Sequence, residues 1–167
     1  MRQNLVFLRA FASHVILLAS VFAVTAGPGR AEMAALPGWS VTKTSHSYKD
    51  LIARVDAAVK ANKMGLVTRA SATLGAASLG KTIPGNMVIG VYRPDFAIRM
   101  LEASEQAGIE APVRLYITEN ADGTATLSYK TPSSVFAPYK DGGEALTAMA
   151  RELDAIFAKI VKEATAP

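Results

Sequence analysis

The stretch Val113–Tyr129, VRLYITENADGTATLSY, decides the fold class. Apolar and polar side chains alternate on both sides of the turn Ala121-Asp122-Gly123. The apolar set is Val113, Leu115, Ile117, Ala125, Leu127 and Tyr129, and the polar set is Arg114, Tyr116, Thr118, Thr126, Ser128 and Lys130. This alternation predicts two antiparallel strands joined by a tight turn, with one face in a core and the other toward solvent.

Apolar spacing outside this hairpin predicts three more strands and three helices. The strands are expected at residues 39–46, 66–71 and 87–92, and the helices at 48–63, from 94 up to Gly108, and at 143–164. Ser47 and Asp50 resemble a capping box at the start of the first helix, and Gly65 is expected to supply the left-handed turn that ends it. The Gly-rich segment before the strand at 87–92 is expected to be a connecting loop.

The order strand, helix, strand, strand, helix, strand, strand, helix indicates an α+β two-layer sandwich. We expect a mostly antiparallel sheet of about five strands, with two packed helices plus a C-terminal helix. A single domain at 38–164 holds these elements, and residues 32–37 form a short linker before it. The chain has 167 residues and 50% apolar content, which is enough for one core of this kind.

The predicted C-terminal helix carries an apolar stripe that steps by three and four residues. Its members are Leu146, Met149, Leu153, Ile156 and Ile160. The favoured interpretation is that this stripe covers the sheet. The alternative is the seam of a homodimer, which so few heptads do not establish.

Residues 1–31 have the pattern of a cleaved secretory signal peptide. A basic start is followed by the apolar run VILLASVFAV at 15–24 and by small residues before Ala31, where we place the cut, with Ala26 as the alternative. Arg9 and His14 interrupt the longer apolar stretch, which argues against a stable membrane anchor, because a span needs about 20 apolar residues. The protein is therefore predicted to be periplasmic or secreted.

The net charge of +4 changes meaning once this leader is removed. Arg2, Arg9 and Arg30 account for three of the 18 basic residues, so 15 remain against 14 acidic ones. A nearly neutral domain without a basic stripe is not expected to bind nucleic acid. The absence of cysteine excludes disulfides, a lipoprotein anchor and any cysteine-ligated metal cluster.

Short Gly and Pro landmarks give the chain a family resemblance. They are Gly38-Trp39-Ser40-Val41, Met64-Gly65-Leu66-Val67, Arg93-Pro94 after the strand at 87–92, and Ala111-Pro112-Val113-Arg114-Leu115-Tyr116. Over about 39–138 the chain resembles the domain of unknown function 302 family, which implies its fold and no established activity. Relatives commonly have Asn-Pro at Arg93-Pro94, and an Asp-His pair where this chain has Arg69-Ala70-Ser71-Ala72-Thr73. Any chemistry of that pair is not expected here.

One segment matches the phosphate-binding loop pattern G-x-x-x-x-G-K-[ST]. It runs from Gly75 to Thr82. The mechanism needs a helix that begins at the Lys-Thr pair, so that backbone N–H groups face the phosphates. Ile83-Pro84-Gly85 follows at once and opposes a helix there. We therefore interpret the match as chance and do not predict nucleotide hydrolysis.

Six residues are the candidates for a ligand site. They are Arg69, Lys81, Tyr92, Arg93, Arg114 and Tyr116. If the folded chain brings them together, four cations beside two tyrosines could hold an anionic group. The alternative without a ligand is that each cation is solvated on a polar strand face.

His46 is the weak candidate for metal binding or catalysis, since no other histidine follows the leader. It could bind a soft metal together with methionines, or act as the base of a hydrolase with Asp50 or Asp56. Neither G-x-S-x-G nor H-E-x-x-H occurs in the sequence. The methionines concerned, Met64, Met87, Met100 and Met149, lie in or beside apolar stripes, where methionine commonly fills the core. No metal site, catalytic residue or cofactor is therefore assigned.

Together these observations favour an exported, non-catalytic module that binds an unidentified small molecule or protein. The alternatives are a small hydrolase that uses His46 and a periplasmic metal handler. The sequence does not identify the ligand.

Overall fold

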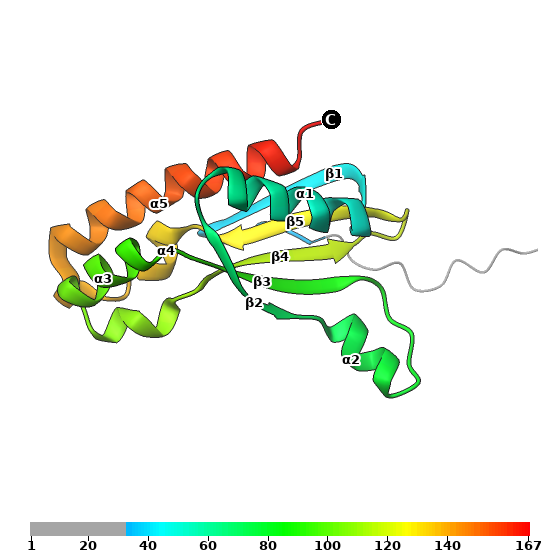
Figure 1. The fold of residues 1–167 in the computed structure, drawn as a ribbon, viewed down its shortest axis with the longest axis horizontal. Coiled ribbons are helices and arrows are strands. Elements are labelled where there is room, and N and C mark those ends of the chain that lie inside the picture. The colour runs from blue at the N-terminus through cyan, green and yellow to red at the C-terminus, as the bar shows by residue number, and fades with distance from the viewer. Residues whose placement is uncertain (1–32) are drawn as a thin grey trace, which may run out of the picture.

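The computed structural model describes residues 33–167, and these residues build one antiparallel sheet of five strands with helices on one face (Figure 1). In chain order the elements are β1 (Trp39–Ser47), α1 (Tyr48–Ala61), β2 (Gly65–Ala70), α2 (Ala72–Ser78), β3 (Asn86–Tyr92), α3 (Pro94–Ala103), the 3-10 helix η1 (Gln106–Glu110), β4 (Val113–Glu119), β5 (Thr124–Lys130), α4 (Pro132–Phe136), the 3-10 helix η2 (Lys140–Gly142) and α5 (Gly143–Ala164). The predicted α+β fold class is confirmed.

The strands lie in the order β1-β5-β4-β3-β2, and every neighbouring pair is antiparallel. The hairpin β4–β5 that the alternation predicts lies at the centre of the sheet. The first strand of the domain pairs with the last one, since Trp39 lies opposite Lys130. One edge strand of the sheet is therefore held by pairing between residues that are far apart in the sequence.

Helix α1 begins as predicted and ends differently. The backbone N–H of Asp50 donates to the Ser47 side-chain oxygen at 3.2 Å, which is the expected N-cap bond. After Ala61 the residue in the left-handed conformation is Lys63, with φ of 57°, so the prediction that Gly65 supplies this turn is wrong. Gly65 is instead the first residue of β2, opposite Tyr92.

The inner face of the sheet is covered by α1 and α5, and α3 packs against α5 at the end of the sheet (Figure 1). Of the predicted C-terminal stripe, Leu146, Met149, Leu153 and Ile160 are buried in this core, whereas Ile156 is only partly buried and Phe157 is buried in its place. Phe157 is fully buried, and its ring centroid lies 5.6 Å from that of Tyr129 on β5. The stripe therefore covers the sheet, and these side chains are not exposed to form the seam of a homodimer.

Helix α3 differs from its predicted apolar stripe at one position. Phe96, Ala97 and Met100 are buried, but Leu101, which was expected beside them, is 51% exposed. The helix ends at Ala103, before Gly108, because the chain bends at Ser104 and continues as η1. Leu101 lies against Gly108 at this bend, outside the core.

The segment between β2 and β3 is an arm that stands off from the sandwich (Figure 1). It contains helix α2 where a connecting loop was predicted, and α2 has no buried residue. Side-chain oxygens tie the two legs of the arm together, because Ser71 donates to Asn86 O and Thr73 to Pro84 O. Leu74 and Leu79 of the arm are exposed.

The predicted signal peptide at 1–31 lies outside the described residues, and so does the first residue of the predicted linker. Within residues 33–167, no helix is both long enough and apolar enough to cross a membrane.

Candidate functional site

The outer face of the sheet, which α1, α3 and α5 leave uncovered, contains a groove of about 440 Å³. Strand alternation puts the polar half of the predicted hairpin on this face. The groove is lined by Trp39, Asn86, Val88, Glu110, Val113, Arg114, Tyr116, Tyr129, Lys130 and Val135. Its floor comes from β1, β3, β4 and β5, and its end wall from η1 and α4.

Two cations lie side by side on the groove floor. Leu115 pairs with Tyr129, so the same antiparallel register places Arg114 directly opposite Lys130, with Cβ atoms roughly 4.5–5.5 Å apart. On the far side of Lys130 is Trp39, whose ring centroid lies 5.9 Å from the Lys130 ammonium nitrogen. On the far side of Arg114 is Gly90 of β3. One cross-strand row therefore contains an aromatic ring, two positive charges and a glycine.

The next row along the strands is aromatic and largely uncharged. Val88 lies opposite Tyr116, and Tyr116 lies opposite Ser128, whose side chain is fully buried. The Asn86 side-chain amide donates a hydrogen bond to the Tyr116 hydroxyl oxygen. That bond leaves the Tyr116 O–H available as a donor.

The end wall supplies the carboxylate closest to Arg114. Glu110 of η1 lies 3.8 Å from the Arg114 guanidinium, and its other oxygen accepts a 2.8 Å hydrogen bond from the Tyr139 hydroxyl. This hydrogen bond, with burial adding to it, raises the pKa of Tyr139 above its ordinary value. Glu110 is thus divided between two partners and reaches Arg114 only at the outer limit of an ion pair.

The structure brings together two of the six predicted ligand residues, Arg114 and Tyr116, and separates the others from them. Arg69 lies on the opposite face of the sheet, where it pairs with Asp56 of α1 at 2.5 Å. Lys81 is exposed on the arm. Tyr92 shares the outer face, but Pro112 packs over the intervening Gly90. A single site made of all six residues is therefore not formed.

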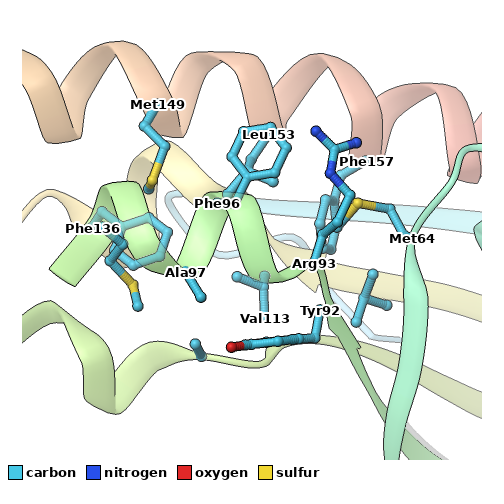
Figure 2. A pocket seen from close by; sticks show the side chains of 13 residues that line it. Met64, Tyr92, Arg93, Phe96, Ala97, Val113, Phe136, Met149, Leu153 and Phe157 are labelled. Carbon is cyan, nitrogen blue, oxygen red and sulfur yellow. The ribbon is translucent and has the colours of Figure 1, made fainter. Parts of the chain in front are cut away.

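Arg93, the remaining candidate, lines a second and smaller pocket at the end of the sheet together with Tyr92 (Figure 2). Its lining is almost wholly apolar and comes from β3, β4, α3, α4 and α5. Its volume is only about 30 Å³, far below that of a typical small-molecule site. We therefore regard this pocket as a packing gap in the core.

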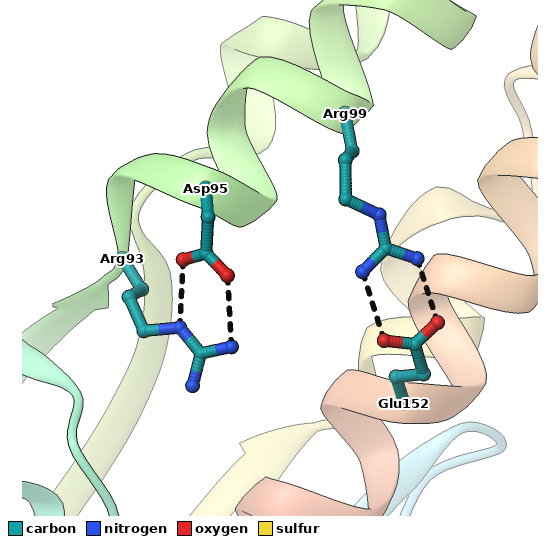
Figure 3. A network of polar contacts seen from close by, with 4 residues as sticks. All are labelled: Arg93, Asp95, Arg99 and Glu152. Carbon is teal, nitrogen blue, oxygen red and sulfur yellow. Dashed lines mark hydrogen bonds and ion pairs between the residues drawn. The ribbon is translucent and has the colours of Figure 1, made fainter.

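The Arg93 side chain is held in place beside that pocket (Figure 3). It makes two hydrogen bonds to Asp95, at 2.7 and 2.9 Å, and lies 4.3 Å from the centroid of the Phe96 ring. Arg99 makes a similar two-bond contact with Glu152 of α5, at 2.8 and 2.6 Å. The hydrogen bonds from these guanidinium groups lower the pKa of Asp95 and of Glu152. The Arg99–Glu152 pair joins α3 to α5, whereas the Arg93–Asp95 pair lies within the first turn of α3.

The residues of the metal and hydrolase hypotheses are dispersed. Nε2 of His46 lies 2.7 Å from the Ala166 carbonyl oxygen, close to the chain end. Met64, Met100 and Met149 are buried in the core, and the sulfur of Met87 lies 3.8 Å from Arg69. Within residues 33–167, no group of three or more His, Asp or Glu side chains is placed to hold a metal ion.

The segment that matches the phosphate-binding loop is the end of helix α2. Gly80, with φ of 69°, donates its N–H to Ala77 O, and Lys81 donates its N–H to Ala76 O. These two bonds form a Schellman motif, which closes the C-terminal end of a helix. Lys81 and Thr82 therefore follow a helix, whereas phosphate binding needs them to begin one.

Residues 40–164 match the domain of unknown function DUF302. The chain belongs to the DUF302 family. The DUF302 fold is also seen in the crystal structure of an uncharacterized conserved DUF302 protein from Bacillus stearothermophilus, with a TM-score of 0.69 at 18% identity. The alignment covers 77% of this chain and 99% of that one. No curated protein matches the sequence.

Two of the four landmarks that carried the DUF302 resemblance, Gly38-Trp39-Ser40-Val41 and the segment 111–116, lie beside the groove. Gly38, with φ of 77°, lies so close to Ser134 of α4 that a side chain would collide, and it leads directly into Trp39. Pro112 packs on Gly90 beside the row that contains Arg114. These DUF302 landmarks therefore position the first strand and the end wall.

Sequence reasoning missed several groove residues of this DUF302 domain: Trp39, Asn86, Val88, Glu110, Val135 and Lys130. Lys130 could have been found, because a hairpin that turns at Ala121-Asp122-Gly123 with paired apolar positions already places it opposite Arg114. Trp39 gave no such signal, since its position depends on the long-range pairing of β1 with β5.

Proposed function

We propose that this DUF302 protein is a non-catalytic module that binds a small organic molecule in the groove on the outer face of its sheet. The observation that carries the proposal is the groove itself. Its volume of about 440 Å³ falls in the range typical of small-molecule sites. It also combines aromatic and aliphatic walls with a few convergent polar groups, as such sites commonly do.

The character of the groove residues supports binding over catalysis. General acid–base and nucleophilic catalysis both need an activating partner within hydrogen-bond reach of the reacting group. His46 lies seven residues along β1 from Trp39, roughly 23 Å at the rise of a strand, and is bonded to Ala166. The Tyr116 hydroxyl is engaged by Asn86, which serves orientation.

We further propose that the protein works after export, with residues 1–31 removed. The support comes from the sequence alone: a basic start, an apolar run and small residues before Ala31. A cysteine-free domain suits an oxidising compartment, because no disulfide has to form there.

Native mass spectrometry of the full chain, expressed with its leader and recovered from the periplasm, tests both parts. We expect a mass that corresponds to cleavage after Ala31, together with a bound small molecule. Val88→Trp fills the groove floor and should remove the bound mass while keeping the circular dichroism of the wild type. Ile98→Trp, on the exposed side of α3, is the matched control and should keep it. Equal occupancy of the two variants, or no bound molecule on any form, overturns the binding proposal.

A further inference from the structure

We infer that the groove selects amphipathic anions: small molecules with a carboxylate, phosphate or sulfonate head and a flat apolar or aromatic body. This inference rests on the proposed function and names its ligand class. It comes from the pairing register of the strands and from the unequal character of the two rows that the register creates.

The first step is the unbalanced charge of the first row. Arg114 and Lys130 are directly opposed on neighbouring strands, and like charges in that position destabilise a sheet. Glu110 reaches Arg114 only at 3.8 Å and also accepts from Tyr139. Among the described residues, no carboxylate forms an ion pair with Lys130, whose ammonium instead lies over the Trp39 ring. An anion placed between the two cations relieves this repulsion.

The second step is the position of that anion relative to the walls. The cationic row adjoins the end wall formed by Glu110 and Val135, so a head group placed there has its remainder directed along the strands. The next row contains Val88 on β3, Tyr116 on β4 and the small, buried Ser128 on β5. Trp39 flanks the cations as an aromatic side wall. A flat apolar body fits this floor, and rings favour stacking on aromatic neighbours.

The third step excludes two other kinds of anion, inorganic phosphate and nucleic acid. A bare inorganic phosphate would satisfy the cations and leave most of a 440 Å³ groove unused. A nucleic acid needs a run of cations along its backbone, and the groove offers only Arg114 and Lys130. The apolar floor beside two cations therefore favours a ligand in which both characters are joined.

A pair of fluorescent probes tests the inference on the full mature chain. 1-Anilinonaphthalene-8-sulfonate and N-phenyl-1-naphthylamine share the same rings and differ only in the sulfonate. We expect the sulfonate probe to bind the wild type at least tenfold more tightly than the neutral one. Arg114→Gln and Lys130→Gln should each weaken the sulfonate probe about tenfold, the size of one lost charged hydrogen bond, and should leave the neutral probe within about twofold.

Two controls separate the groove from the rest of the surface. Arg151→Gln removes the same charge from α5, where the arginine pairs with Glu144, and should change neither probe. Val88→Trp should abolish the binding of both probes to the groove. Any fluorescence that remains in this variant comes from dye bound elsewhere, for example to the exposed leucines of the arm. Competition by 1-naphthoate and 1-naphthyl phosphate then ranks the head groups, and inorganic phosphate should compete only weakly.

The outcomes distinguish this inference from the proposed function. If both probes bind equally well in a manner sensitive to Val88→Trp, and Arg114→Gln has no effect, the groove binds small molecules but the preference for anions is wrong. If inorganic phosphate displaces the sulfonate probe as well as 1-naphthyl phosphate does, the apolar floor has no part and the inference fails. If Val88→Trp leaves both probes bound, the groove is not the site and the proposed function fails with it.

Discussion

Alternate residues of the hairpin β4–β5 form its two faces, and the two faces have opposite effects on the stability of the fold. On the inner face Leu115, Ile117 and Leu127 are buried beneath α1 and α5. On the outer face Arg114, Tyr116 and Lys130 line an open groove. Burial of the inner residues stabilises the folded state, whereas the like charges of Arg114 and Lys130 on the outer face destabilise it. We propose that an anionic ligand offsets this unfavourable charge pair.

The largest effect is expected on the covered face. Phe157→Ala should lower the free energy of unfolding by about 3–5 kcal/mol, because the fully buried ring leaves a cavity against Tyr129. Tyr116→Ala removes an aromatic ring from the open face and should cost less than half as much. Urea denaturation of both variants measures the difference. Equal losses would break the contrast between the two faces.

A smaller loss of unfolding free energy is expected at the contact between α5, which covers the inner face, and α4, which forms the end wall of the groove. The side chain of Asp154 on α5 accepts hydrogen bonds from the backbone N–H of Ser133, at 2.9 Å, and from its hydroxyl, and so fastens α4, which carries Val135. Asp154→Ala should cost about 1–2 kcal/mol of unfolding free energy, as lost capping bonds commonly do. It should also weaken the sulfonate probe, because the end wall loosens. Unchanged affinity at reduced stability would show that the wall does not depend on α5.

On the open face a substitution should stabilise the fold. Lys130→Gln removes one of two opposed cations, and we expect the free energy of unfolding to rise by a few tenths of a kcal/mol. The gain should shrink as salt is added, because salt screens exposed charges. Thermal denaturation at low and high ionic strength measures it. A loss of stability at low salt would mean that Lys130 has a structural role against Trp39.

The smallest effect concerns the ion pairs at the rim of the covered face. The Arg99 hydrogen bonds lower the pKa of Glu152 in the folded protein, so this pair stabilises the fold above the unfolded pKa. The contribution is lost as the pH falls through the lowered folded pKa. Glu152→Gln should therefore lower the melting temperature slightly at pH 7 and leave it nearly unchanged at pH near 2. Glu105→Gln, an exposed carboxylate after α3, serves as the control and should show no such pH dependence.

The sequence predicted the elements whose periodicity is local and strong. The hairpin and the helix Gly143–Ala164 were found because alternation and a spacing of three and four are visible within single windows. Helix α2 was missed because it buries nothing, so no apolar stripe marks it. Its start is set by one capping bond, from Leu74 N–H to the Ser71 side chain, in a segment otherwise rich in Gly and small residues.

The candidate site could be predicted only where strands adjacent in the sequence pair with each other. Two of the predicted ligand residues, Arg114 and Tyr116, both line the groove, since both lie on the polar side of the hairpin. Arg69 was misplaced because β2 is bulged between Leu66 and Thr68, which interrupts the simple alternation, and its side chain pairs with Asp56. Trp39 was out of reach because the pairing of β1 with β5 is a property of the whole sheet.

That pairing has a consequence for the order in which the site comes into being. A ribosome releases Trp39 about 90 residues before Lys130, so β1 must wait unpaired until nearly the whole sheet has been synthesised. The aromatic side wall of the groove therefore cannot be assembled before β5 has been made, although it is encoded first. The ligand that we propose would therefore recognise only chains in which β1 has paired with β5, and by mass action it would stabilise that state.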